Sequence, residues 1–437
     1  MAIYKKMASF FGKKHHTSFV FLTLFILCLF LIVVLFVPKT PIGNQQESYQ
    51  KAYYHSVEWQ ALPQFENGHL GSVRQALLRS CTAFMAKPAD TPLFTTPNKV
   101  REISGTVKDW WPFCTALQER QKHIDVSEVS LYTLLKKYLK PYALKEQNQT
   151  LSLFGLGKVL PNTKGLFTGY YEPVVRGNLL KTPKFQTPLY NIPEDVIVAD
   201  LGDFNPELSG KRLVGRLQGN RLVPYYERAE IENGALKTHM PFLWLENPID
   251  KFFLQIQGSG RVVLPDGQFI FVGYGGANGH AYTAIGRYMA EQGYLPLEDV
   301  TMQSIRTWLE QNPDKLTEVL HKNKSYVFFK EYQDGPYGTQ GVLLTPEHSL
   351  AVDARVVPLG TPVFLQSKIT ATGENFEKLM VAQDTGGAIK GAIRGDIYFG
   401  YGKQAAELAG QQKSQGKLFI LMPKEISVTN NDITQEN

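Results

Sequence analysis

Three aspartates in the C-terminal third of the chain are candidates for acid catalysis. Asp384 ends an apolar, strand-like run, and the two glycines that follow it, Gly386 and Gly387, let the backbone approach a ligand closely. Asp396 lies farther along the same glycine-rich segment, and Asp353 follows an earlier apolar run. Carboxyl groups at strand ends can protonate the leaving group when a sugar or peptide bond breaks. The alternative interpretation is that each aspartate only caps a turn.

Aromatic, amide and hydroxyl side chains gather in glycine-bounded turns, mostly upstream of these aspartates. Flat rings pack on the apolar faces of sugars, and short polar side chains bind sugar hydroxyl groups. The pattern therefore predicts a carbohydrate-binding groove, although a single tyrosine can equally belong to the hydrophobic core. The predicted substrate-binding residues are Thr168, Tyr170, Tyr171, Gln257, Ser259, Tyr274, Asn278, His280, Tyr282, Gly386 and Gly387.

Other site chemistries lack their sequence signatures. The chain has no His-x-x-x-His, Cys-x-x-Cys or calcium-loop pattern, so we expect no metal and no cofactor. Ser259 lies in a Gly-Ser-Gly segment that only half matches a serine nucleophile elbow, and a hairpin follows it where the elbow needs a helix. The glycine-rich stretch 273–279 lacks the Lys-Ser/Thr pair of a phosphate-binding loop.

An uncharged run at residues 17–37 stands out from an ordinary composition of 43% apolar and 20% charged residues. The run is long enough to cross a bilayer core of about 30 Å, and no cleavage site follows it. Four lysines precede it, which predicts a cytoplasmic stub at residues 1–16 and export of everything beyond the anchor. Residues 38–50 are polar and predict a tether. Cys28, inside the run, is expected to be embedded in the membrane rather than lipid-modified.

The exported part is nearly neutral. The formal net charge of +6 falls to +2 (6 − 4) when the four lysines of the stub are left out. No basic stripe of the kind that neutralises phosphates is present in the sequence, so we expect no nucleic acid partner.

The scaffold that must position these residues begins with helices. Apolar residues at helical spacing predict helices at 72–86 and 107–120, and a third from Val129 that stops at Pro141. Cys81 and Cys114 lie on the first two helices, and export to an oxidising compartment favours a disulfide between them. The alternative is a pair of free buried thiols.

Strands and turns follow from residue 151 onward. The predicted strands are 165–173, 252–257, 261–264, 268–272, 326–329, 341–344, 351–357, 361–365, 379–383 and 417–422. The third and fourth of these form a hairpin across Pro265-Asp266-Gly267. Further helices are predicted at 282–292, 302–311, 314–321 and 403–409, and the tail 425–437 is predicted to be disordered.

Five collinear segments resemble membrane-bound lytic murein transglycosylase A and its relatives, including their C-terminal 3D domain. The segments are FTGYYEPV, LQIQGSG, GANGHAYTAIGRY, GTQGVLLTPEHSLAVDARVVPLGTPVFL and VAQDTGGAIKGAIRGDIYFG, and the likeness covers roughly Phe167–Pro423. The resemblance implies a mainly β fold with flanking α-helices, in which a double-psi β-barrel carries an inserted second β-domain. We therefore expect barrel parts at 51–180 and 325–424, and a substrate-groove domain at 181–324.

The resemblance also implies an activity. It implies cleavage of the β-1,4 bond between N-acetylmuramic acid and N-acetylglucosamine, with a 1,6-anhydro ring as product and Asp384 as the catalytic residue. Asp353 and Asp396 match the family's other two aspartates and are expected to support catalysis. The substrate's C6 hydroxyl would replace the water and second carboxylate of ordinary glycosidases. Asp384 then needs a raised pKa, so Lys390 should face solvent or a structural partner.

Two features depart from the family pattern, and two rival functions stay open. The best-known members are lipoproteins whereas this chain predicts a spanning helix, and the loop 391–395 is longer than usual. The rivals are a peptidoglycan hydrolase that uses Asp353 or Asp396 as base, and a glycan-binding module without catalysis. Expected partners are peptidoglycan glycan strands, the inner membrane of a Gram-negative bacterium through the N-terminal helix, and proteins of cell-wall synthesis or division. The catalytic part is expected in the periplasm.

Overall fold

The computed structural model describes residues 52–62, 70–94, 99–121, 128–146, 161–208 and 211–425. The predicted stub, anchor and tether at residues 1–50 lie outside this part of the chain, as do residues 426–437 of the predicted tail. Among the helices within it, none has the length and apolar character needed to cross a membrane.

The largest sheet has eight strands drawn from both ends of the described chain. In spatial order they are β1 (Ala52–Ser56), β2 (Leu139–Glu146), β17 (Lys413–Pro423), β14 (Pro362–Lys368), β15 (Asn375–Asp384), β13 (Ser349–Val352), β16 (Arg394–Tyr401) and β3 (Gly165–Glu172). A further pairing between β17 and β3 closes six of these strands into a barrel. The pairs β13–β15 and β16–β3 are parallel. All four residues of β13 are buried, as expected for a strand covered on both faces.

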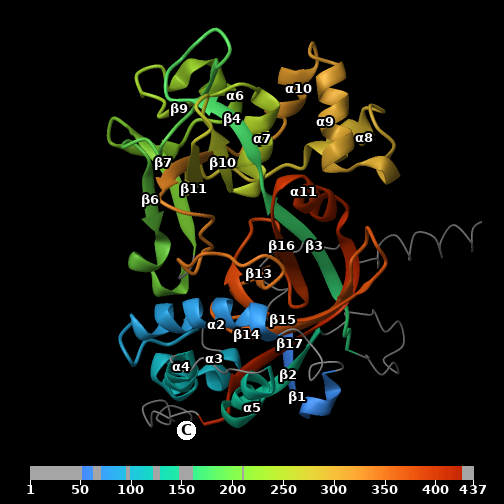
Figure 1. Cartoon of the computed structure of the whole chain (residues 1–437). Coiled ribbons are helices and arrows are strands. Elements are labelled where there is room, and N and C mark those ends of the chain that lie inside the picture. Colours follow the sequence, from blue (N-terminus) through green and yellow to red (C-terminus); the bar gives the residue numbers. More distant parts are fainter. Residues whose placement is uncertain are drawn as a thin grey trace, which may run out of the picture. The chain divides into compact units, whose positions relative to one another are not determined.

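A second, six-stranded sheet is formed by the middle of the chain. Its spatial order is β12 (Val327–Tyr332), β11 (Phe269–Ala277), β10 (Ser259–Val263), β4 (Val174–Asn178), β9 (Leu243–Leu245) and β5 (Thr187–Leu189). β4 follows the barrel strand β3 directly, and Figure 1 shows the chain passing from one sheet to the other there. Since β4 and β12 belong to this sheet, it begins before residue 181 and ends after residue 324. The predicted hairpin is confirmed, with Val263 opposite Phe269.

Smaller elements surround the second sheet. A three-stranded sheet is built from β6 (Ile197–Asp200), β7 (Arg212–Gln218) and β8 (Arg221–Pro224). The α-helices are α6 (Arg228–Glu230), α7 (Pro248–Gln257), α8 (Ile285–Glu291), α9 (Met302–Gln311) and α10 (Leu316–His321), and the short η elements are Leu201–Asp203, Pro206–Leu208, Ile231–Ala235 and Leu297–Asp299. Apolar side chains of α7 to α10 pack into one buried cluster that includes Phe252, Met289 and Leu309.

The N-terminal helices pack against the barrel. They are η2 (Trp59–Ala61), α2 (Leu70–Met85), α3 (Lys99–Ser104), α4 (Val107–Gln121) and α5 (Glu128–Tyr138), and α2 lies against β15. The predicted disulfide is present and joins Cys81 on α2 to Cys114 on α4. Phe84 packs on Trp110 beside it, with ring centroids 5.3 Å apart. α11 (Gly402–Gln411) covers β3 and β16, close to the predicted helix at 403–409.

The structure corrects three predicted strands. Residues 252–257 form part of α7, because Asn247 caps its first turn, Pro248 is compatible with that turn, and Gly258 ends it at a φ of 77°. Residues 341–344 make only one bridge, between Tyr337 and Leu343. The strand predicted at 351–357 ends at Val352, since the carbonyl of the next residue accepts the N–H groups of residues 356 and 357 in a turn. The sequence did not predict β1, β2, β4 to β9 or β16 as strands.

Candidate functional site

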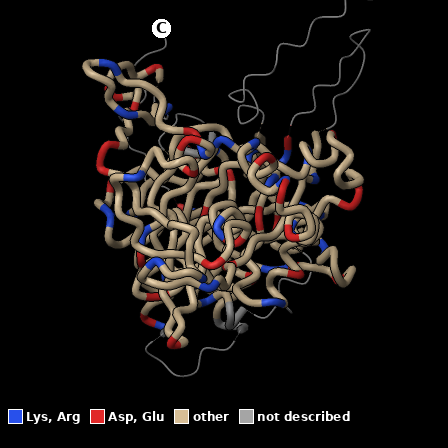
Figure 2. Tube along the Cα trace, turned by 90° about the horizontal axis from the view of Figure 1, so that it is seen from above, with Lys and Arg blue, Asp and Glu red and all other residues tan. Residues whose placement is uncertain are grey.

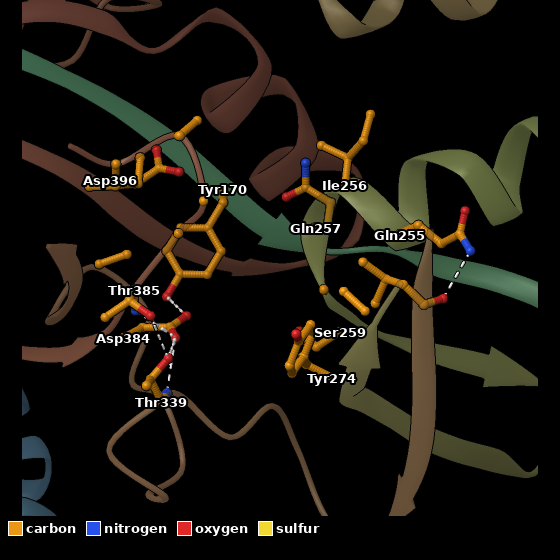
Figure 3. Close-up of a pocket in the computed structure, with 18 of the residues that line it drawn as sticks. Tyr170, Gln255, Ile256, Gln257, Ser259, Tyr274, Thr339, Asp384, Thr385 and Asp396 are labelled. Carbon is orange, nitrogen blue, oxygen red and sulfur yellow. Dashed lines mark hydrogen bonds between the residues drawn. The ribbon is translucent and has the colours of Figure 1, made fainter. Parts of the chain in front are cut away.

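A pocket of about 1060 Å³ lies between the barrel and the second sheet. β3, β13, β15, β16 and the turn 385–389 form its barrel wall, and α7, β10, β11 and β12 form the opposite wall. Figure 3 shows Asp384 and its hydrogen-bond partners on one side and Ser259 and Tyr274 on the other. The predicted carboxylate and several of the predicted sugar-binding residues therefore share one cavity.

Asp384 lies at the C-terminal end of β15, and four hydrogen bonds fix its carboxyl group. One oxygen accepts from the hydroxyl of Tyr170 at 2.9 Å. The other accepts from the N–H and the hydroxyl of Thr339, at 2.9 and 3.0 Å, and from the N–H of Thr385 at 2.8 Å. The side chain thus faces the cavity in a single orientation, set by β3, β15 and the loop before β13 (Figure 3).

The surroundings raise the proton affinity of Asp384. Burial raises its pKa above the ordinary value for aspartate, and the hydrogen bonds from Thr339, Thr385 and Tyr170 oppose this shift without cancelling it. The pKa of Tyr170 is also raised, first by its own burial and then by the neighbouring Asp384 charge, so its hydroxyl stays a donor. Lys390 is exposed and lies outside the pocket lining, as predicted.

Asp396 is the second carboxyl group of the pocket. It accepts a 2.6 Å hydrogen bond from Thr168, whose hydroxyl in turn accepts from Arg394 at 2.8 Å. Burial raises the pKa of Asp396 to about 6, the Thr168 hydrogen bond and the Arg394 charge lower it, and the charge of Asp384 raises it. The two carboxyl groups therefore interact electrostatically, and a negative charge on one raises the affinity of the other for a proton.

Asp353 has a different environment. It is buried, lies outside the pocket lining, and binds the guanidinium of Arg355 at 2.8 and 2.7 Å and the N–H of Gly391 at 2.9 Å. Burial alone would raise its pKa, but these hydrogen bonds and the Arg355 charge hold the pKa below the usual value. The group is thus an ionised anchor for the turn that leads into β16.

The predicted sugar-binding residues divide into two groups. Seven line the pocket, namely Tyr170, Gln257, Ser259, Tyr274, Tyr282, Gly386 and Gly387. The exposed fractions of Tyr274 and Tyr282 are 56% and 46%, which leaves their rings free to stack on a ligand. The other four lie outside the lining and are Thr168, Tyr171, Asn278 and His280.

Two of the residues outside the lining, Asn278 and His280, have clear structural partners. Asn278 is buried and donates to the carbonyls of Tyr226 and Lys324, which holds the loop after β11. His280 hydrogen-bonds the Tyr225 carbonyl at 2.7 Å. Thr168 reaches the site only through Asp396. The backbone N–H of Tyr171 donates to the side-chain oxygen of Gln257 at 3.1 Å.

Several lining residues were not predicted. Thr339 carries two of the four hydrogen bonds to Asp384, and its place between Gly338 and Gly341 was the signal that could have identified it. Lys330, Tyr332, Tyr337 and Arg228 also line the pocket. Among the described residues, no group of three or more His, Cys, Asp or Glu side chains is arranged to hold a metal ion.

Comparison with known families explains this arrangement. Residues 166–330 match the model of the MltA specific insert domain, and residues 348–422 match the model of the 3D domain. The "Membrane-bound lytic murein transglycosylase A" of Vibrio cholerae is 30% identical over 310 residues, which cover 68% of this chain and 77% of the relative. The chain belongs to the membrane-bound lytic murein transglycosylase A family.

Other members agree in sequence and fold. The Escherichia coli enzyme of the same name is 35% identical over 263 residues, which span 58% of this chain and 65% of that relative's length. A crystal structure of MltA from Neisseria gonorrhoeae superposes with a TM-score of 0.69 at 31% identity, covering 89% of this chain and 99% of that one. E. coli MltA with bound chitohexaose gives a TM-score of 0.57 at 25% identity, covering 80% and 90%. The predicted family is therefore confirmed.

Proposed function

We propose that this protein is a peptidoglycan lytic transglycosylase. It cleaves the β-1,4 bond between N-acetylmuramic acid and N-acetylglucosamine and leaves a 1,6-anhydromuramic end. The observation that carries the proposal is the setting of Asp384, a carboxyl group with a raised pKa, held by four hydrogen bonds on the barrel wall of a large pocket. Membership of a family whose relatives are named lytic murein transglycosylases supports it.

Protonated Asp384 acts first as general acid. It gives its proton to the glycosidic oxygen as the bond from the muramic acid C1 breaks, and positive charge develops on the sugar ring. The resulting carboxylate is stabilised by the donors of Tyr170, Thr339 and Thr385, which already point at it. The hydrogen bonds that oppose the raised pKa therefore assist the step in which the proton leaves.

The sugar's own C6 hydroxyl then closes the reaction. Its oxygen attacks C1, and its proton returns to Asp384, so the acid is regenerated and no water enters the product. The nucleophile is tethered to the reacting ring, which removes the need for a second carboxylate to position a water molecule. Within the described residues that line the pocket, Asp396 is the other carboxyl group, and it accepts a hydrogen bond from Thr168, whose hydroxyl accepts from Arg394. We assign Asp396 the role of raising the proton affinity of Asp384.

The opposite wall binds the glycan. Tyr274 and Tyr282 offer exposed ring faces to sugar rings, and Gln257 and Ser259 offer hydrogen bonds to sugar hydroxyl groups. The chitohexaose bound to the E. coli relative, a linear amino-sugar chain, supports a groove for glycan strands. We place the strand across both walls, with the bond to be cleaved beside Asp384.

The same proposal extends to architecture and location. The closed ring of six strands corresponds to a double-psi β-barrel, with the second sheet inserted between β3 and β13. Residues 17–37 anchor the chain in the inner membrane as a single span, so the site lies in the periplasm of a Gram-negative bacterium.

Product analysis tests the activity. Purified sacculi are digested with the full-length protein in detergent, and the ends of the released glycans are identified by mass spectrometry. We expect 1,6-anhydromuramic ends, which are lighter than reducing ends by one water. Reducing ends would indicate a hydrolase with Asp396 as base, and binding without release would indicate a glycan-binding module. Either result would overturn the proposal.

A further inference from the structure

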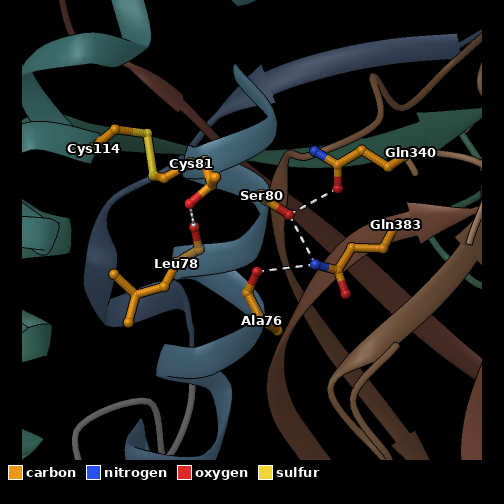
Figure 4. The surroundings of a disulfide bond; sticks show 8 residues. Ala76, Leu78, Ser80, Cys81, Cys114, Gln340 and Gln383 are labelled. Atoms are coloured by element: carbon orange, nitrogen blue, oxygen red, sulfur yellow. Dashed lines mark hydrogen bonds between the residues drawn. A yellow bond between two sulfur atoms is a disulfide. The ribbon is translucent and has the colours of Figure 1, made fainter. Parts of the chain in front are cut away.

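Helix α2 contacts the segments that hold Asp384 from outside the pocket. Ala76, Ser80 and Phe84 are four residues apart, so they lie on one face of the helix, and that face meets β15 and the loop before β13. Ser80 and Phe84 are buried, with exposed fractions of 2% and 1%. Figure 4 shows this junction beside the disulfide.

Gln383 is the centre of the junction. It precedes Asp384 on β15, so its side chain points to the opposite face of the strand, away from the pocket. Its amide nitrogen donates to the carbonyl of Ala76 at 2.9 Å and to the hydroxyl of Ser80 at 2.8 Å. Its amide oxygen accepts from Ser349 on β13 at 2.6 Å. A fully buried amide therefore fixes the end of β15 to α2 and to its neighbouring strand.

The loop that carries Thr339 is held by the same helix. Ser80 donates to the side-chain oxygen of Gln340 at 2.8 Å, and the backbone N–H of Gln340 donates to the Gln383 carbonyl at 3.0 Å. A Cβ on Gly338 would come within 2.3 Å of that carbonyl, so only glycine allows the loop to lie this close to β15. Farther along, Arg79 binds the Leu343 carbonyl at 3.1 Å.

A continuous set of contacts thus runs from α2 to the reacting carboxyl group. Ser80 holds Gln340, and its neighbour Thr339 donates two hydrogen bonds to Asp384. Cys81 follows Ser80 directly, and its disulfide with Cys114 ties α2 to α4. This bond limits movement of α2 along the barrel.

We propose that Ser80 and Gln383 are positioning residues for Asp384, and that the disulfide-tied helix α2 serves as the buttress on which they act. Neither side chain touches the substrate. They keep Thr339 and the end of β15 in place, so that the acid stays aligned with the glycosidic oxygen and its conjugate base stays stabilised. The inference rests on the proposed role of Asp384 as the acid.

If α2 no longer holds the loop that carries Thr339, the pH–rate profile should shift in a predictable direction. The Thr339 hydrogen bonds oppose the raised pKa of Asp384, so a loosened loop raises that pKa further. The acid then stays protonated to higher pH. The alkaline limb of the pH–rate profile therefore moves to higher pH, while the maximal rate falls. The titratable and charged groups that face Asp384 or share its pocket are Tyr170, Asp396, Arg228, Tyr274, Tyr282, Lys330, Tyr332 and Tyr337, and none of them lies on α2.

Ser80→Ala is the test, with Thr82→Ala as the matched control. Thr82 lies on the same helix, is exposed, and donates only to the Leu78 carbonyl of its own helix. We expect Ser80→Ala to lower kcat for release of anhydro ends about ten-fold with KM unchanged, because misplacement of a catalytic group is costly. We also expect the alkaline limb of the pH–rate profile to shift to higher pH, and amide hydrogen exchange to be faster in the peptide that contains Thr339. Thr82→Ala should match the wild type in all three measurements.

Two further variants separate positioning from a general loss of structure. Ser80→Thr keeps the hydroxyl group and should keep the wild-type alkaline limb. Cys81→Ser combined with Cys114→Ser keeps Ser80 but frees α2 from α4, and should reproduce the Ser80→Ala shift in the same direction. Chitohexaose affinity, measured by calorimetry, should stay within two-fold of wild type in every variant.

The outcomes distinguish this inference from the proposed function. If the wild type releases anhydro ends and Ser80→Ala matches Thr82→Ala in rate, pH profile and exchange, the buttress is refuted and the activity stands. A fall in rate without any shift of the alkaline limb or change in exchange also refutes the buttress. If the wild type itself releases no anhydro ends, the proposed function fails, and the exchange of the Thr339 peptide still reports whether α2 holds the loop.

Discussion

The two walls of the pocket differ in how tightly their side chains are held. On the barrel wall, Asp384 accepts four hydrogen bonds from three residues, and Asp396 accepts one from Thr168. On the opposite wall, Tyr274 and Tyr282 are about half exposed. Proton transfer requires placement within a fraction of an ångström, whereas stacking on a sugar tolerates adjustment. From this difference we propose that the barrel wall performs the chemistry and the second sheet performs the binding.

Removing the acid is the strongest way to break this division. Asp384→Asn keeps the size and most of the hydrogen bonding of the side chain but cannot donate the proton. We expect kcat to fall about 10³-fold, within the range for loss of a general acid, while chitohexaose affinity changes less than two-fold. Asp266→Asn, in the exposed hairpin turn between β10 and β11, is the matched control. Activity above a tenth of the wild-type value would remove Asp384 from the mechanism.

A smaller effect is expected at the second carboxyl group. Asp396→Asn removes a carboxyl group that interacts electrostatically with Asp384, and with it the repulsion by which we propose that Asp396 raises the proton affinity of Asp384. The pKa of Asp384 falls, so the alkaline limb of the pH–rate profile should move to lower pH and the rate at neutral pH should fall about ten-fold. This shift is opposite in sign to that expected for Ser80→Ala. A profile that keeps its shape would show that Asp396 acts in another way.

The binding wall should respond in affinity instead of rate. Tyr274→Ala removes an exposed ring, so we expect chitohexaose to bind about five-fold more weakly with kcat within two-fold of wild type, in keeping with about 1 kcal/mol for an aromatic contact. Tyr53→Ala, an exposed tyrosine on β1 outside the pocket lining, is the control for isothermal calorimetry. A large fall in kcat at unchanged affinity would contradict the division between the walls.

The least catalytic effect is expected at Asp353, which should matter for stability. The pKa of Asp353 is lower in the folded protein than in the unfolded chain. Its carboxylate therefore stabilises the fold at pH values above the unfolded-state pKa, and this contribution is lost as the pH falls through the folded-state pKa. Asp353→Asn should therefore cost about 2 kcal/mol at pH 7, and the difference from wild type should shrink below about pH 4. Thermal unfolding at both pH values measures this. A difference that stays constant across that range would exclude the ion pair as its source.

The sequence predicted the strand that ends at Asp384 because an apolar run followed by glycines is a local pattern. It predicted the family through segments that keep their order. It did not predict α7, because Phe252 and its neighbours are apolar in a short run that periodicity alone cannot assign, and the deciding signals were Asn247 and Gly258 at its ends.

The contacts of the site depend on pairs that are distant in sequence. Tyr170 meets Asp384 across 214 residues, and Gln383 meets Ala76 across 307. Asp353 follows an apolar run just as Asp384 does. Its carboxyl group nevertheless lies outside the pocket lining, paired with the guanidinium of Arg355. Local sequence shows where a carboxyl group ends a strand, but closure of the barrel decides which of the carboxyl groups reaches the cavity.

A substrate without the internal nucleophile tests the central claim most directly. In a glycan whose muramic acid at the cleavage position has hydrogen in place of the C6 hydroxyl, the wild-type protein should bind the strand and leave the bond intact. The account predicts no products while an unmodified strand is cleaved to anhydro ends under the same conditions. Cleavage of the modified strand to a reducing end would mean that water attacks, and that Asp384 does not rely on the sugar's own hydroxyl.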